Sequence, residues 1–235
     1  MYVKTKGIIL KNTNYSESSL ITKIYTQTSG LKTFMLRGVR KGKASIRTSM
    51  IQPLSIVSLD FFQKPNTTIF NVKELKNTPV LYEIHSNIFK KTVAMFYTEV
   101  LNQCLTEEES DEALFGFLEN EIIALDHSNF SADLPIRFLI KLSNYLGVYP
   151  QGSHNETTPF FCIESGGFVS QSSLYTSSIE TSFLISNFIL DINNNQQFNR
   201  SVRKDALDQI IKYYQFHVTR NKKIKSVDIL REILN

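Results

Sequence analysis

The sequence predicts an α+β protein in which a small five-stranded β-barrel precedes a mainly α-helical C-terminal part. Two observations predict this order. The first 80 residues contain short segments rich in β-branched and aromatic residues, several of which alternate with a period of two. Beyond Pro79, apolar residues recur every three or four positions, which is the period of a helix. We therefore expect one domain at residues 1–79 and a second at residues 80–235.

Five strands are expected in the first domain, at residues 7–10, 20–25, 32–37, 54–62 and 69–75. Between the second and third, Thr28-Ser29-Gly30 supplies a turn whose glycine can adopt positive φ. Five short strands in about 75 residues suit a closed or nearly closed barrel, for which the oligonucleotide-binding (OB) barrel is the commonest solution.

Helices are expected in the second domain at residues 84–104, 110–125 and 133–147, near residue 180, and from Ser201 and Ser226. Ser110 and Asp133 can act as N-caps, because their side chains accept hydrogen bonds from the first turn. Gly147 is expected to end the third helix. Residues 151–178 contain many Gly, Ser and Thr and are expected to form a loop-rich insertion with room for one short hairpin.

Charge is divided unevenly along the chain. The first 80 residues contain thirteen lysines and arginines but only three acids, a formal charge of +10. The other 155 residues contain thirteen basic and nineteen acidic residues, a charge of −6. Such asymmetry points to a polyanionic partner, because a positive field attracts phosphates and the counterions that they release favour binding.

The basic residues of the first domain are the candidate DNA-binding residues. No acid interrupts the chain between Glu17 and Asp60, and Gly38 and Gly42 lie within the densest part. The candidates are Lys23, Lys32, Arg37, Arg40, Lys41, Lys43 and Arg47. Tyr25, Phe34 and Phe61 are candidate stacking surfaces for unpaired bases, although a place in the barrel core is the more common fate of such rings.

Signatures of catalysis are missing. The sequence has no phosphate-binding loop, dinucleotide fingerprint, zinc-protease motif or nucleophile elbow, and its four histidines are far apart. We therefore expect no enzymatic activity and no cofactor. There is no apolar run of membrane-spanning length and no signal peptide, and the two cysteines suggest no disulfide framework. A cytoplasmic protein with reduced thiols is expected.

Short motifs in the same order and spacing resemble the bacterial RecO family over nearly the whole length. They are Gly7-Ile8-Ile9-Leu10, Tyr15-Ser16-Glu17-Ser18-Ser19-Leu20, Tyr25-Thr26 with Gly30, Gly38-Val39-Arg40-Lys41, Gln52-Pro53-Leu54, Tyr213-Tyr214-Gln215-Phe216-His217 and Ile224-Lys225-Ser226. The resemblance implies a non-catalytic recombination mediator with an N-terminal OB barrel and a helical C-terminal domain. Such a protein binds single- and double-stranded DNA, anneals complementary strands and acts near the bacterial nucleoid.

The resemblance also implies partners, and this chain departs from the family pattern at one site. Members bind RecR and the C-terminal tail of single-stranded-DNA-binding protein (SSB), and they help RecA replace SSB at gaps. The family's basic stretch matches Arg37 to Arg47 here. Many members hold zinc with four cysteines, but this chain has only Cys104 and Cys162. We therefore expect no structural zinc, and we expect packing and hydrogen bonds to hold the loop around Cys162.

An SSB tail is acidic and ends in a hydrophobic residue with a free carboxylate, so its receptor needs an apolar groove flanked by cations. Arg137 and Lys141 lie one helical turn apart beside Phe138 and Leu142 and are candidates for this role. An ordinary solvated helix face is the competing interpretation.

Two other functions share the same charge pattern. The barrel could bind an acidic segment of a partner protein, as an interaction adaptor, because fold alone does not determine what an OB barrel binds. It could also bind RNA, which only a contact to the 2′-hydroxyl distinguishes from DNA.

Overall fold

The structure, a computed structural model, describes residues 2–39, 46–63, 66–105, 110–192 and 198–233. The chain forms two compact units, Met1–Asn129 and Phe130–Asn235. Within the described residues, no helix is both long and apolar enough to cross a membrane.

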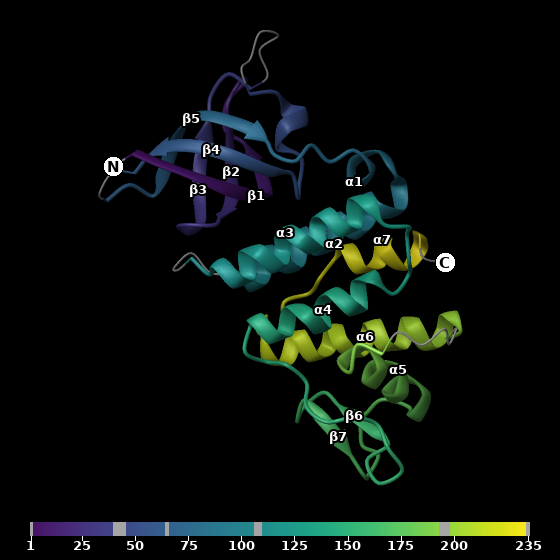
Figure 1. Cartoon of the computed structure of the whole chain (residues 1–235). Coiled ribbons are helices and arrows are strands. Elements are labelled where there is room, and N and C mark those ends of the chain that lie inside the picture. The colour runs from purple at the N-terminus through teal and green to yellow at the C-terminus, as the bar shows by residue number, and fades with distance from the viewer. Residues whose placement is uncertain (1, 40–45, 64–65, 106–109, 193–197, 234–235) are drawn as a thin grey trace. The chain divides into compact units, whose positions relative to one another are not determined.

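The first unit begins with a closed five-stranded barrel of the predicted OB type, shown in purple and blue in Figure 1. Its strand order is β1-β2-β3-β5-β4, with β3 and β5 parallel and the other neighbours antiparallel. The strands are β1 (Tyr2–Asn14), β2 (Leu20–Thr26), β3 (Gly30–Leu36), β4 (Ile56–Phe62) and β5 (Ile69–Asn77), with a 3-10 helix, η1 (Thr48–Ile51), before β4. Gly30 takes the positive φ expected for the β2–β3 turn, at 66°.

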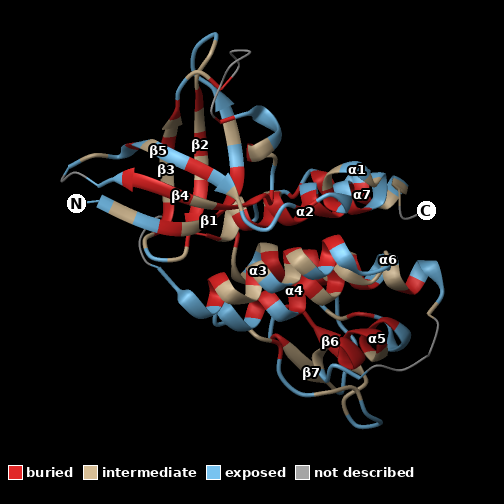
Figure 2. Ribbon diagram, turned by 45° about the horizontal axis from the view of Figure 1, so that its top comes forward, coloured by how far each residue is buried: buried red, intermediate tan, exposed pale blue. Residues whose placement is uncertain are grey.

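The barrel interior is apolar and mostly aliphatic, with three phenylalanine rings packed together within it. Phe34, Phe61 and Phe70 meet with ring centroids 5.0 to 6.0 Å apart. Buried and half-buried positions alternate from Leu20 to Ile24 of β2, whereas β4 is buried on both faces over most of its length (Figure 2). Val39, Ile46 and Ile51 join the same core from the connection between β3 and β4.

Three helices complete the first unit: α1 (Glu83–Ser86), α2 (Ile88–Cys104) and α3 (Glu112–His127). Asn102 of α2 donates a hydrogen bond to the Leu10 carbonyl of β1 over 3.0 Å. On α3, Glu119 pairs with Lys6 at 2.7 Å, and Phe115 stacks on Tyr25 with centroids 6.1 Å apart. Strands give way to helices near Pro79 as predicted, but the compact units divide later, because these helices pack on the barrel.

The second unit contains α4 (Leu134–Tyr145), α5 (Ile179–Ile189), α6 (Arg200–His217), α7 (Ser226–Ile233) and a hairpin of β6 (Phe160–Cys162) and β7 (Gly167–Val169). Tyr214 of α6 is buried and donates a hydrogen bond to the Leu139 carbonyl of α4 over 2.6 Å. The hairpin lies within the predicted loop-rich insertion. It is held by packing of Phe161 on Phe168 and Tyr213, and by a 2.8 Å contact between His217 and the Ile163 carbonyl.

Several helix starts differ from the predicted ones. The cap of α3 is Asp111, not Ser110, and accepts from the Leu114 amide at 2.9 Å. The cap of α6 is Asn199, not Ser201, and accepts from the Val202 amide at 2.9 Å. Both caps reach the third amide of the helix, which is the preferred geometry. The helix expected at residues 84–104 is interrupted at Asn87, whose side chain caps α2.

Candidate nucleic-acid interface

The basic segment lies in the connection between β3 and β4. Arg37 directly follows β3, Arg47 precedes η1, and both are exposed. Val39 and Ile46 are only 3% and 8% exposed, so the flanks of the segment are anchored in the barrel core. The predicted residues Arg40, Lys41 and Lys43 lie outside the described residues.

Lys23 and Lys32 do not lie together. Lys23 is opposite Thr33 on the outer face of the β2–β3 pair, whereas Lys32 is opposite the buried Ile24. Since directly opposed residues share a face, Lys32 is on the inward side of β3. It is also five residues before Arg37, or about 17 Å along an extended strand. Lys23 and Lys32 therefore lie on opposite faces of the strand pair, and Thr33, the partner of Lys23, is four residues before Arg37, or about 13 Å along the strand.

Lys11 is a basic residue of this surface that the sequence analysis missed. It is exposed on β1 and lies directly opposite Lys23 of β2. Like charges placed opposite each other destabilise a strand pair. The strand predicted at residues 7–10 ended before Lys11, whereas β1 continues to Asn14 because β2 pairs with it. The outer face of β1 and β2 thus carries two lysines at directly opposed positions.

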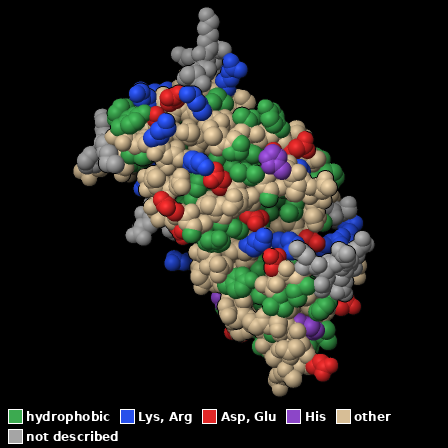
Figure 3. Space-filling view, viewed as in Figure 1, with side chains coloured by type: hydrophobic (Ala, Val, Ile, Leu, Met, Phe, Trp, Pro, Cys, Tyr) green, Lys and Arg blue, Asp and Glu red, His purple; other side chains and the backbone are tan. Residues whose placement is uncertain are grey.

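Lys11, Arg37 and Arg47 form no ion pair with any described residue. The face over β1, β4 and β5 differs, because there lysines and acids are interspersed (Figure 3). On that face Lys76 pairs with Glu74 at 2.5 Å. The outer face of β1 and β2, together with Arg37 after β3, is hereafter the basic face.

The aromatic residues proposed for base stacking are core residues. Phe34 and Phe61 are fully buried, and Tyr25 is 2% exposed beneath Phe115. Burial raises the pKa of Tyr25 to about 12. The stacking hypothesis is therefore wrong for all three, and the core interpretation is confirmed.

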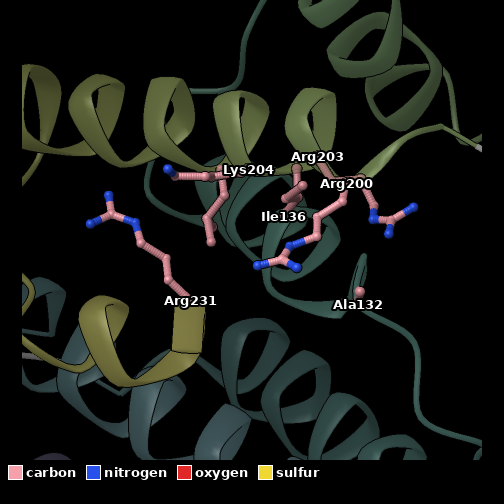
Figure 4. A pocket seen from close by; sticks show the side chains of 7 residues that line it. Ala132, Ile136, Arg200, Arg203, Lys204 and Arg231 are labelled. Carbon is pink, nitrogen blue, oxygen red and sulfur yellow. The ribbon is translucent and has the colours of Figure 1, made fainter. Parts of the chain in front are cut away.

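A pocket in the second unit combines cations with apolar side chains. Figure 4 shows Arg200, Arg203 and Lys204 on α6 and Arg231 on α7 around Ile136 of α4. Ala132 and Leu207 complete its lining. We call this the basic pocket.

Two cations of the basic pocket form ion pairs with described carboxylates, and two do not. Arg231 pairs with Asp208 and Asp228, and Arg203 lies 3.8 Å from Asp133. Arg200 and Lys204 are exposed and form no ion pair with a described residue. These two are therefore available to an incoming anion.

The two residues predicted to bind the SSB tail, Arg137 and Lys141, lie on α4 and do not line the basic pocket. The Arg137 guanidinium lies 4.5 Å from the Phe188 ring centroid and 3.5 Å from Asp191. Lys141 is exposed one turn later. Their neighbours Phe138 and Leu142 are buried, so these rings and methyl groups do not line an open groove.

The described residues contain no group of three His, Cys, Asp or Glu side chains that could hold a metal ion. Cys162 is buried in β6, and Cys104 lies in α2. Burial raises the pKa of the Cys104 thiol to about 12, which makes it a poor nucleophile.

Comparison with known proteins shows which family the sequence matches. Residues 1–78 match the family model described as "Recombination protein O N terminal", and residues 85–158 match "Recombination protein O C terminal". The chain is 36% identical over 238 residues to the "DNA repair protein RecO" of Flavobacterium johnsoniae, with both chains fully covered. Proteins with the same name from Flavobacterium psychrophilum and Bacteroides fragilis are each 31% identical, again with full coverage.

Proposed function

Because this chain belongs to the RecO family of DNA repair proteins, we propose that it is a non-catalytic recombination mediator that binds DNA through the basic face of its barrel. In this role it binds single- and double-stranded DNA, anneals complementary strands and helps RecA replace SSB at gaps. The observation that carries the proposal is the direct opposition of Lys11 and Lys23, with Arg37 at the end of the neighbouring strand. RecR is expected as a further partner.

The proposed mechanism is electrostatic. Cations on the basic face neutralise the phosphates of a bound strand and release its counterions, which gives affinity without sequence preference. A strand whose charge is partly neutralised repels a second strand less. Complementary bases can then pair at the protein surface, which is annealing without catalysis of bond formation.

The test is the salt dependence of DNA binding, measured by fluorescence anisotropy with labelled single-stranded DNA. Replacing Lys11, Lys23 and Arg37 together with Ala removes up to three phosphate contacts. The slope of log affinity against log salt should then become shallower by about two units, at roughly 0.7 per contact. Lys91→Ala, an exposed lysine on α2, is the matched control and should leave the slope unchanged.

A second variant addresses the segment outside the described residues. Replacing Arg40, Lys41 and Lys43 with Ala should produce a further loss of slope if the segment contacts DNA. Unchanged slopes in both variants would reject DNA binding by the barrel. A wild-type protein that binds an acidic peptide but no DNA would instead favour the adaptor function.

We also propose that the acidic tail of SSB binds at the basic pocket. Ile136 and Leu207 can receive a terminal hydrophobic side chain, while Arg200 and Lys204 can pair with carboxylates. Arg137 and Lys141 remain the competing site that the sequence predicts. The chemistry of the basic pocket fits the tail better, because apolar and cationic groups line the same hollow.

Two double variants distinguish the sites by isothermal titration with a peptide of the SSB C-terminus. Arg200→Ala with Lys204→Ala should weaken binding about tenfold or more, since two charge-assisted contacts are lost. Arg137→Ala with Lys141→Ala should leave the affinity within about twofold. The reverse pattern would assign the tail to the α4 site.

A further inference from the structure

Two large aromatic rings are exposed side by side on the barrel. Tyr2, at the start of β1, lies opposite Phe62, at the end of β4, and the ring centroids are 5.4 Å apart. Tyr2 is 46% exposed and Phe62 is 51% exposed, whereas Phe34, Phe61 and Phe70 fill the barrel core. Rings of this size are usually buried, so an adjacent pair in solvent suggests a partner.

The Tyr2 ring is held in place. Its hydroxyl donates a hydrogen bond to the carboxylate of Asp60, a residue that is itself only 8% exposed. The Lys73 ammonium lies 5.3 Å from the Tyr2 ring centroid, which is a cation–π contact. A ring fixed from two sides loses little further freedom when something stacks beside it. The pair is therefore preorganised for binding.

Cations flank the pair. Lys4 is exposed and lies opposite Asp60 in the β1–β4 register, and Lys73 is exposed on β5. Neither lysine forms an ion pair with a described residue. In Figure 3 hydrophobic, basic and acidic side chains adjoin one another over β1, β4 and β5. Aromatic surface next to exposed lysines is a combination that binds single-stranded nucleic acid.

We propose that Tyr2 and Phe62 form a stacking platform for one unpaired nucleobase, whose flanking phosphates contact Lys4 and Lys73. This inference rests on the proposed DNA binding and adds a second contact, distinct from the basic face. The platform holds a base by its π-face and is therefore indifferent to sequence. It can take only bases that are not already stacked in a duplex, so it favours single strands over double-stranded DNA.

The absence of tryptophan from the sequence allows a direct test. Phe62→Trp introduces a single indole at the platform, and a base stacked on it should quench its fluorescence. Tyr82→Trp is the matched control, because Tyr82 is 73% exposed but directly precedes α1, outside the barrel strands. Each full-length variant is titrated with a (dT)15 oligonucleotide and with an abasic strand of equal length. Anisotropy of labelled strands measures binding in parallel.

The expected result is quenching of Phe62→Trp by (dT)15, little quenching by the abasic strand, and none for Tyr82→Trp. In a second measurement, Phe62→Leu should lower the affinity for (dT)15 roughly tenfold. Its affinity for the abasic strand and its salt slope should stay the same, because no charge is removed.

Binding of (dT)15 by anisotropy without quenching, or equal quenching by the abasic strand, would overturn the platform while leaving DNA binding by the basic face intact. An unchanged (dT)15 affinity in Phe62→Leu would also overturn it and would point to an apolar protein partner for the pair. Failure of every variant and of the wild type to bind DNA would defeat both proposals.

Discussion

At Gly7, in the middle of β1, the barrel has no room for a side chain. A Cβ atom there would lie 2.5 Å from the Ile24 side chain and 3.0 Å from that of Leu59. Both neighbours belong to the barrel core, so relief requires movement of packed side chains. Only glycine permits the close approach of β1 to β2 at this point.

Gly7→Ala should therefore destabilise the protein by about 1–3 kcal/mol, the usual cost of overpacking. The matched control is Gly116→Ala on α3, where an added Cβ meets nothing within 4 Å. That change should raise the free energy of unfolding by about 0.5–1 kcal/mol, because alanine is a better helix former than glycine. Urea unfolding midpoints measure both, and equal shifts of one sign would contradict the packing argument.

His85 makes stability depend on pH. Burial lowers its pKa from the usual value of 6.5, and its Nε2 lies 3.3 Å from the Ser55 hydroxyl. As the pH falls below about 6.5, the unfolded chain takes up a proton at this site before the folded protein does. The contribution of His85 to stability is thus complete above pH 6.5 and is lost toward its lower folded pKa.

His85→Gln should accordingly reduce the loss of stability between pH 7.5 and pH 5, because glutamine can keep the hydrogen bond without titrating. Urea unfolding at the two pH values measures the difference. His127→Gln, at an exposed position on α3, is the comparison. If His85→Gln and the wild type lose equal stability on acidification, the assignment to His85 is incorrect.

Individual residues of the interface were only partly predictable from the sequence. The density of charge around Arg37 and Arg47 is visible in the chain, and both are exposed. The face on which Lys32 lies and the place of Lys11 opposite Lys23 could not be predicted, because the face of a strand residue depends on pairing partners far along the chain. For the same reason, composition did not show that Phe34 is core while Tyr2 is exposed.

At the scale of elements, the pairing of β1 with β2 has opposite effects on the stability of the fold and on the proposed affinity for DNA. Lys11 and Lys23 face each other across the two strands, and their repulsion weakens the pair. Lys11→Thr should raise the free energy of unfolding by a few tenths of a kcal/mol, since threonine also favours strands. The same change should lower DNA affinity and the salt slope. Parallel urea and anisotropy measurements test this, and a loss of both stability and affinity would contradict it.

Element type was more predictable than element ends. Period-two and helical patterns correctly located the five strands and the change to helices. Asp133 directly precedes α4 as expected, but its side chain accepts no hydrogen bond from the first turn, so the predicted side-chain cap is wrong. The helix ends at Tyr145, two residues before Gly147, which has a φ of 71°. At Asn199 and Asp111, however, several neighbouring polar residues could cap, and local sequence does not show which one aligns with the third amide.

For the molecule as a whole, the first compact unit needs its helices. Ile8 and Leu10 of β1 are at most 1% exposed, and Tyr25 lies beneath Phe115 of α3. A fragment of residues 1–79 would expose these side chains, whereas residues 1–129 keep them covered. The longer fragment should unfold cooperatively in urea, and the shorter one should aggregate or show no cooperative transition. A stable 1–79 fragment would instead support the domain boundary that the sequence predicts.

The central claim is that the outer face of β1 and β2 receives the DNA phosphates. Lysine footprinting tests it most directly, by mass spectrometry of the full-length protein methylated with and without saturating single-stranded DNA. Lys11 and Lys23 should lose reactivity when DNA is bound, while Lys91 on α2 keeps it. Unchanged reactivity of Lys11 and Lys23 under saturating DNA would contradict the account.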